Sequence, residues 1–171
     1  MTSSREFDID PEALYQSTAD LLYRVALSQL QNREDAQDAV QEAFLKYLRV
    51  RPSLQSAEHA RAWMIRVTVN QCRDLLRRKK VRAYLPLDEI AELIADEVPS
   101  PRETAGHVRE LLQHLEALPP KNRIVLTLHS LEGLSVEEIA ASLRLSRSAV
   151  KMRLSRGREQ FRKLLEKEGS L

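Results

Sequence analysis

Basic side chains near the C-terminus form the densest group of potential ligand-binding residues in this sequence. Residues 144–163 contain eight Lys or Arg side chains and a single acid, Glu159. Upstream, Ser135 and Glu138 have the spacing of a helix capping box, and Ser146 is a good N-cap for the next helix. Two short helices around a tight turn, the second of them basic, are typical of a helix-turn-helix, whose second helix enters the DNA major groove.

The second of these helices has an apolar stripe that must pack inward. The stripe consists of Val150, Leu154, Gly157, Phe161 and Leu164 or Leu165. On the other faces lie Arg147, Lys151, Met152, Ser155 and Arg156. Side chains in the N-terminal half of such a helix read base edges, and basic flanks hold phosphates. The alternative is a solvated basic helix on an ordinary bundle, with Met152 as a packing residue.

A second basic group lies on the helix predicted at residues 58–82. Polar side chains fall on one line of this helix at i, i+4, i+7 and i+11: Arg66, Asn70, Arg73 and Arg77. The helix then ends in a basic run: Arg77, Arg78, Lys79 and Lys80. An Arg line that contains one Asn suits a nucleic-acid backbone with an unpaired base nearby. Trp63 borders the line and can stack on such a base or pack in the core, and the line itself has the alternative of an ordinary solvated face.

The helix predicted at residues 33–49 has two contrasting faces. Its apolar face consists of Ala36, Ala39, Val40, Ala43, Phe44, Tyr47 and Leu48. The opposite face carries Asp38, Gln41, Glu42, Leu45 and Arg49. Leu45 lies about 180° from the apolar stripe, so we expect it to be exposed among acids and amides. Such a residue is either a docking point for a protein partner or a stray surface leucine.

These segments belong to a chain that we predict to be all-helical. The sequence has only four glycines, and apolar residues recur with helical rather than alternating spacing. We predict helices at residues 11–31, 33–49, 58–82, 105–118, 121–132, 135–143 and 146–166. Residues 83–108 carry one basic and six acidic side chains, whereas the flanking segments are both mildly basic. We therefore expect two small helical domains, residues 1–82 and 109–171, joined by an acidic linker at residues 83–108.

Composition argues against several other classes of protein. Cys72 is the only cysteine, which excludes an intramolecular disulfide and a cysteine zinc cluster. The four histidines, at positions 59, 107, 114 and 129, are scattered, and no hydrolase, metalloprotease or phosphate-loop motif occurs. We therefore expect no enzyme activity, no metal and no cofactor. The polar N-terminus is unlike a signal peptide and no apolar run reaches the length of a membrane span, so we expect a soluble, cytoplasmic protein.

Together these segments resemble a known family. Residues 33–46 are similar to the DAxDxxQExF motif of sigma region 2, and residues 61–78 are similar to the AW, N, D and RR run that follows it. Residues 117–119, 132–140 and 148–158 are similar to sigma region 4. The pieces occur in the family's order and cover nearly the whole chain. The sequence therefore resembles the small extracytoplasmic-function RNA polymerase sigma factors, which lack a long region 1 and region 3.

The resemblance implies roles for the residues above. Asp38, Gln41, Glu42, Leu45 and Arg49 would contact the β′ clamp helices of core RNA polymerase, and region 4 would contact the β flap. The opened −10 strand would be held by Trp63, Arg66, Asn70, Arg73, Arg77, Arg78, Lys79 and Lys80. The −35 element would be read by Lys151, Met152, Ser155 and Arg156, with Arg147, Ser148, Arg153 and Arg158 beside them. An anti-sigma factor would control the protein, and it would join the nucleoid when bound to polymerase.

The sequence leaves two questions open: which promoter sequence the protein would read, and whether it is a sigma factor or another DNA-binding protein. Arg147, Ser148 and Ala149 stand where the family more often has Val, Gly and Thr. A helix-turn-helix repressor or activator with an N-terminal dimerisation or sensor domain would also explain residues 134–165, although it leaves the Arg66–Arg77 line unexplained. That alternative predicts a dimer on a palindromic operator, whereas a sigma factor needs core polymerase.

Overall fold

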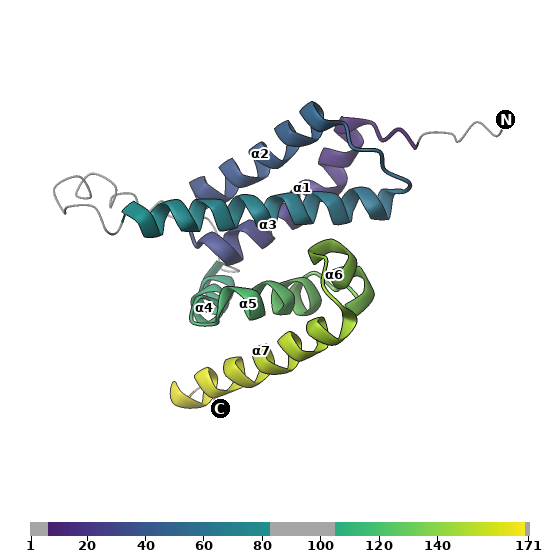
Figure 1. Ribbon diagram of the computed structural model, residues 1–171. Coiled ribbons are helices and arrows are strands. Elements are labelled where there is room, and N and C mark those ends of the chain that lie inside the picture. The colour runs from purple at the N-terminus through teal and green to yellow at the C-terminus, as the bar shows by residue number, and fades with distance from the viewer. Residues whose placement is uncertain (1–6, 83–104, 170–171) are drawn as a thin grey trace.

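The computed structural model describes residues 7–82 and 105–169, and within these ranges all regular structure is helical. The first bundle contains α1 (Pro11–Leu30), α2 (Arg33–Val50) and α3 (Ala57–Arg82), which pack against one another (Figure 1). The Asp10 carboxylate caps α1 by accepting from the Ala13 N–H at 3.2 Å. The Asn32 side chain caps α2 by accepting from the Asp35 N–H at 3.0 Å. Gln31 ends α1 in the left-handed region at φ 54°, and Asn32 next to it begins α2, so these two residues separate helices that would otherwise run into one another.

The core of the first bundle combines large side chains with alanines. Leu22, Met64 and Ile65 are fully buried, and burial of one such side chain is worth about 1.5–3 kcal/mol. Alanines on α2 allow the helices to approach closely: Ala36, Ala39 and Ala43 are each at most 1% exposed. The all-helical fold and the alanine face of α2 predicted from periodicity are confirmed.

The second bundle contains α4 (Ala105–Glu116), α5 (Pro120–Leu126), the π-helical turn η2 (Thr127–Leu131), α6 (Val136–Leu143) and α7 (Arg147–Lys167). The predicted helix at residues 121–132 is therefore correct in extent but not uniform. In η2 the Glu132 N–H donates to the carbonyl oxygen of Thr127, five residues back, at 3.2 Å. This wider turn leaves Leu131 47% exposed while Leu128 is fully buried.

The two bundles lie against each other. α3 crosses α6, and α1 contacts α4, α5 and η2 (Figure 1). In this arrangement α7 lies on the outer side of the second bundle, away from α3. The packing thus leaves one face of α7 open and brings α3 against the helix-turn-helix.

Most helix boundaries agree with the sequence predictions to within two residues, but one face assignment is wrong. Leu48 was expected on the buried face of α2 and is 44% exposed. Tyr47 fills the inward position of that turn, and its hydroxyl donates to the carbonyl oxygen of Ile9 at 3.2 Å. Leu48 is turned about 100° from it, at the edge of the bundle. Residues 83–104, most of the predicted acidic linker, lie outside the described residues.

Candidate nucleic-acid interface

The helix-turn-helix is built from two capped helices and a tight turn. Ser135 and Glu138 form a reciprocal capping box: the Ser135 hydroxyl accepts from the Glu138 N–H at 3.1 Å, and the Glu138 carboxylate accepts from the Ser135 N–H at 2.7 Å. That backbone hydrogen bond is the largest of the causes that lower the pKa of Glu138, and Arg61 adds to it. Arg144 ends α6 in the left-handed region at φ 54°, and Ser146 caps α7 through the Ala149 N–H at 3.1 Å. The turn between the two helices therefore comes from local hydrogen bonds of the sequence itself.

The inward stripe of α7 packs as the periodicity predicts. Val150, Leu154 and Gly157 are buried, and the apolar side chains further along are partly buried. A Cβ on Gly157 would lie 3.4 Å from the carbonyl oxygen of Asn122, so this glycine lets α7 approach α5 closely. The stripe fixes which face of α7 points to solvent.

The solvent face of α7 carries the residues predicted to read DNA. Seven of the eight predicted residues are exposed: Arg147, Ser148, Lys151, Met152, Ser155, Arg156 and Arg158. Arg153 is half-buried. Arg147 forms an exposed ion pair with Glu137 at 2.7 Å, which links the N-terminus of α7 to α6. The face therefore presents cations, two hydroxyls and a thioether, which can contact phosphates and base edges together.

The second basic group, on α3, is only partly open. Its exposed members are Asn70, Arg73, Arg77, Arg78, Lys79 and Lys80. Lys79 pairs with Asp35 at the start of α2, and Arg77 lies 3.7 Å from Asp74. Arg66, the first member of the line, is half-buried and donates to the carbonyl oxygens of Ala141 at 2.9 Å and Ser142 at 3.1 Å. The structure thus separates Arg66 from the rest of the line.

Trp63, which borders the polar line of α3, also packs against Tyr47 of α2. It is half-buried, and its ring meets that of Tyr47 edge-on, with centroids 5.9 Å apart and planes at 69°. Tyr47 is itself buried and bonded to Ile9. The packing alternative for Trp63 is therefore supported.

The face of α2 opposite the alanines is open. Asp38, Gln41, Glu42, Leu45 and Arg49 are all exposed, and Leu45 is 49% exposed as expected. Glu42 and Arg49 lie 4.0 Å apart across this face. An exposed leucine surrounded by carboxylates and an amide has the composition of a small protein-docking surface.

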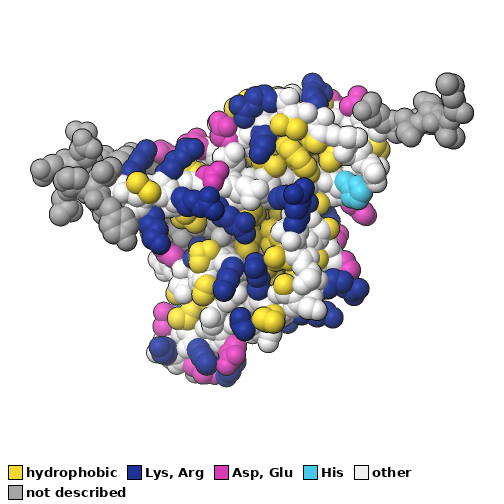
Figure 2. All heavy atoms as spheres, viewed as in Figure 1, with side chains coloured by type: hydrophobic (Ala, Val, Ile, Leu, Met, Phe, Trp, Pro, Cys, Tyr) yellow, Lys and Arg dark blue, Asp and Glu magenta, His cyan; other side chains and the backbone are white. Residues whose placement is uncertain are grey.

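On the face drawn in Figure 2, Lys and Arg side chains are spread over both bundles, and most acidic side chains lie toward its edges. An apolar groove of about 290 Å³ opens in the second bundle between α4, η2 and α7. Its lining is mainly Leu111, Leu115, Leu126, Leu131, Phe161 and Leu165. Arg158 and Arg162 also line it, so Arg158 lies between the groove and the exposed basic face of α7.

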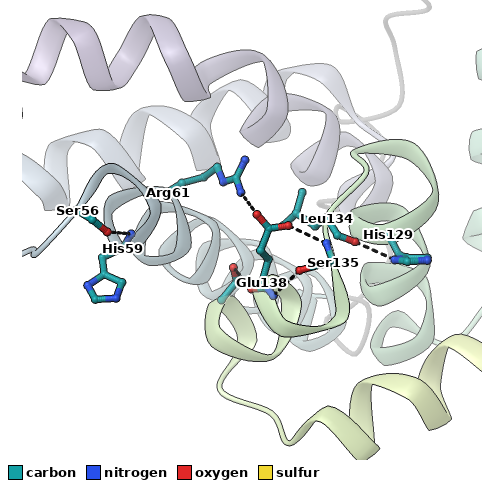
Figure 3. A network of polar contacts seen from close by, with 8 residues as sticks. Ser56, His59, Arg61, His129, Leu134, Ser135 and Glu138 are labelled. Atoms are coloured by element: carbon teal, nitrogen blue, oxygen red, sulfur yellow. Dashed lines mark hydrogen bonds and ion pairs between the residues drawn. The ribbon is translucent and has the colours of Figure 1, made fainter.

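Contacts between the bundles were not anticipated from the sequence. Arg61 of α3 reaches Glu138 of α6 at 2.6 Å, and the same carboxylate caps α6 (Figure 3). Arg24 of α1 forms a bidentate pair with Glu132 at 2.7 and 2.9 Å. Arg123 of α5 is only 6% exposed. Arg123 is followed directly by three apolar residues, Ile124, Val125 and Leu126. This position next to an apolar run is the feature of the sequence from which burial of Arg123 could have been predicted.

Two further polar groups are buried for structural reasons. His114 lies between the Glu110 carbonyl oxygen, 2.6 Å from Nδ1, and the Glu168 carboxylate, 2.5 Å from Nε2. These contacts raise the pKa of His114, with the Glu110 carbonyl as the largest cause and Glu168 next.

Burial raises the pKa of the Cys72 thiol to about 12, so this cysteine stays protonated. Among the described residues, no group of acids, histidines and cysteines is suited to hold a metal ion, and no helix is long and apolar enough to cross a membrane.

Comparison with known proteins agrees with this arrangement. Residues 14–82 match the family model of sigma-70 region 2, and residues 109–161 match that of sigma-70 region 4. The chain is 33% identical over 162 residues to the ECF RNA polymerase sigma factor SigE of Mycolicibacterium smegmatis, and the match covers 93% of this chain but 63% of that relative. It is 31% identical to the ECF RNA polymerase sigma factor SigW of Bacillus subtilis, with 85% of this chain and 83% of SigW covered.

A solved structure shows the same fold. The sigma factor RpoE of Bartonella quintana, crystallised in complex with the anti-sigma factor NepR, superposes with a TM-score of 0.72 at 20% identity. The superposition covers 91% of this chain and 96% of RpoE. The order of the two matched regions, the helix-turn-helix and the identity to SigW lead to one conclusion: the chain belongs to the extracytoplasmic-function group of the sigma-70 family of RNA polymerase sigma factors.

Proposed function

We propose that this protein directs core RNA polymerase to specific promoters and helps to open the −10 region. The observation that carries the proposal is the open face of α7, on which Lys151, Met152, Ser155 and Arg156 are all exposed opposite the buried stripe. A helix held in this way fits the DNA major groove at its N-terminal half. In this proposal those four side chains read the −35 element, while Arg147, Ser148, Arg153 and Arg158 hold the adjacent backbone.

The α3 line takes the second promoter element in this proposal. Asn70 and the exposed cations from Arg73 to Lys80 hold the opened −10 strand, with Arg66 and the edge of Trp63 at one end. Backbone cations bind any strand, whereas an amide can pair with the edge of an unstacked base. The protein supplies no covalent chemistry: its binding energy places the polymerase and holds the separated strand, so it is not an enzyme.

Two exposed surfaces are available for the polymerase. We assign the α2 face around Leu45 to the β′ clamp helices, since a leucine within a polar rim is a suitable anchor for a helical partner. We assign the groove between α4, η2 and α7 to the β flap, because its apolar lining can bury the apolar side of a helix. With polymerase as its partner, the protein works in the cytoplasm and reaches the nucleoid as part of the holoenzyme.

An anti-sigma factor is the proposed regulator. RpoE, which has the same fold, was crystallised with the anti-sigma factor NepR. Since the chain spans 63% of the length of SigE, partners and regulation are proposed here for the matched regions. The α2 face around Leu45 and the groove between α4, η2 and α7 are the surfaces such a partner has to cover to block assembly with polymerase.

Stoichiometry separates the proposal from a dimeric repressor. The mass of complexes formed with purified core polymerase and with promoter DNA should be measured by light scattering after gel filtration. The proposal predicts one copy of the protein per polymerase, and specific DNA binding only when polymerase is present. A symmetric dimer that binds a palindromic duplex without polymerase would contradict it.

A further inference from the structure

Glu137 and Arg147 form an ion pair across the turn of the helix-turn-helix. Nη2 of Arg147 lies 2.7 Å from Oε1 of Glu137, and the two side chains are 65% and 57% exposed. Glu137 belongs to the first turn of α6, and Arg147 is the first residue of α7. The Glu137–Arg147 pair therefore places a carboxylate beside the exposed basic face of α7, a carboxylate to which the function proposed above gives no role.

The position of Arg147 in its helix gives Glu137 a local electrostatic role. The N-terminal end of a helix carries a partial positive charge, which disfavours a cation at its first residue. The Glu137 carboxylate offsets this cost for Arg147, and it is itself placed favourably because it lies in the first turn of α6. One acidic side chain thus stabilises the start of α6 and holds a guanidinium at the start of α7.

The strength of the pair decides what it can do. An exposed ion pair is worth little to stability and changes a population by up to about fivefold. That is enough to keep the Arg147 guanidinium on one side of the turn for most of the time. The pair uses Nη2, so the donors on Nε and Nη1 remain for an acceptor on DNA. A side chain held in this way binds a matching acceptor at a lower entropic cost than a free one.

The pair also affects binding to DNA of any sequence. An unpaired arginine can neutralise whichever phosphate is near, and such a contact strengthens binding equally on all sequences. The Glu137 carboxylate cancels the charge of Arg147 and repels phosphates, which weakens that general attraction. Phosphate contacts at a fixed place, in contrast, set the register in which the base-reading side chains meet the groove. A held Arg147 therefore favours one register over the others.

We propose that Glu137 is a positioning residue for Arg147 and that the pair sharpens the choice of −35 sequence. The inference rests on the proposed function, in which Arg147 holds the backbone beside the −35 element. With Glu137 present, Arg147 contacts DNA at one place and aligns the rest of α7. Without Glu137, Arg147 contacts phosphates on any sequence, so general affinity rises while discrimination between promoters falls.

The test uses Glu137→Gln, with Glu159→Gln as the matched control. Glu159 is also 57% exposed and forms an ion pair, with Lys163 at 3.3 Å, but in the far half of α7. One measurement is binding of the full chain alone to a random-sequence 20-base-pair duplex at several salt concentrations. The other is run-off transcription by the holoenzyme on promoters in which only the −35 element is randomised. Its readout is the ratio of signal between the most and the least used −35 sequences.

Glu137→Gln should strengthen binding to the random duplex about two- to fivefold, the range for loss of one exposed ion pair. The salt slope should steepen by about 0.9, as expected for one more phosphate contact. In transcription, the −35 ratio should fall about two- to fivefold, whereas Glu159→Gln should leave this ratio unchanged. Arg147→Gln should lower the ratio as Glu137→Gln does, and the double variant should add little to either.

Two results would overturn the proposal. One is the same −35 ratio in Glu137→Gln as in the unaltered protein. The other is a fall in the ratio that Glu137→Gln still causes in the Arg147→Gln background, because the carboxylate would then act without Arg147. An unaltered protein with no −35 preference would contradict the proposed function as well, whereas a preference that Glu137→Gln leaves intact contradicts this inference alone. Thermal unfolding of each variant verifies that it remains folded.

Discussion

Arg123 of α5 donates to the carbonyl oxygen of Ser28 in α1 across 3.3 Å, although 95 residues separate them in the sequence. The same guanidinium donates to Gln29 at 3.2 Å and, within its own bundle, to Glu116 and Leu118 at 2.9 Å each. One buried cation therefore caps the C-terminal ends of two helices, one in each bundle. With Arg66 it makes a reciprocal pair: each bundle supplies an arginine that caps a helix of the other.

Arg123→Met should destabilise the protein by about 2–4 kcal/mol, since it leaves buried carbonyl oxygens without donors. Burial lowers the pKa of Arg123, but the group stays charged at neutral pH, so its loss also removes a charge from the interior. Lys121→Met, an exposed change two residues away on α5, is the control and should stay within about 0.5 kcal/mol. Denaturant unfolding measures both variants, and equal stability would contradict the capping role.

His114 should make the stability of the second bundle depend on pH. Both of its ring nitrogens face acceptors, which suits the doubly protonated imidazolium. Because the pKa of His114 is raised in the folded protein, this stabilisation is complete below the ordinary histidine pKa and is lost as the pH rises through the raised value.

The comparison of the unaltered protein with His114→Gln tests this dependence. The loss of thermal stability in the variant should be larger at about pH 5.5 than at about pH 9. His59→Gln, a change of an exposed histidine on α3, is the control for loss of an imidazole. A pH-independent loss in His114→Gln would mean that packing alone explains the role of His114.

Leu45→Glu should weaken binding to core polymerase at least about tenfold, because it removes an apolar anchor from a surface of acids and amides. The side chain is 49% exposed, so the free energy of unfolding should change by no more than about 0.5 kcal/mol. Val50→Glu, at the exposed end of the same helix, is the control for added charge. Equal polymerase affinity in the two variants would remove the α2 face from the interface.

Arg156→Ala should weaken promoter binding by the holoenzyme. If Arg156 reads a base, the loss should be about 1–3 kcal/mol and should depend on the base at particular −35 positions. If it contacts only phosphate, binding should weaken on all sequences and the salt slope should fall by about 1. Lys163→Ala removes the same charge from the far half of α7, where Lys163 pairs with Glu159 at 3.3 Å. Filter binding at several salt concentrations distinguishes these outcomes, and identical behaviour of both variants would contradict a DNA-facing role for Arg156.

The local parts of this architecture were predictable from the sequence because they depend on neighbours in the chain. Ser135 and Glu138 fixed the start of α6, and the stripe from Val150 to Phe161 fixed the orientation of α7. Leu45 was predicted to be exposed because helical spacing alone sets its direction.

The parts that were not predicted depend on residues far apart in the sequence. Arg61 and Glu138 are separated by 77 residues, and nothing in either local pattern indicates the other. Arg66 was assigned to an open line for the same reason: periodicity places it on a face of α3 but does not reveal that the end of α6 lies against Arg66. The π-helical turn at Thr127–Leu131 also escaped prediction, because the apolar spacing on either side is compatible with one continuous helix.

Run-off transcription with purified core polymerase on a library of promoter fragments tests the central claim most directly. Polymerase with this protein should start at a defined subset of fragments that polymerase alone ignores, and Leu45→Glu and Arg156→Ala should each reduce that selective signal. The same spectrum of start sites with and without the protein would contradict the claim that its two basic helical surfaces direct polymerase to promoters.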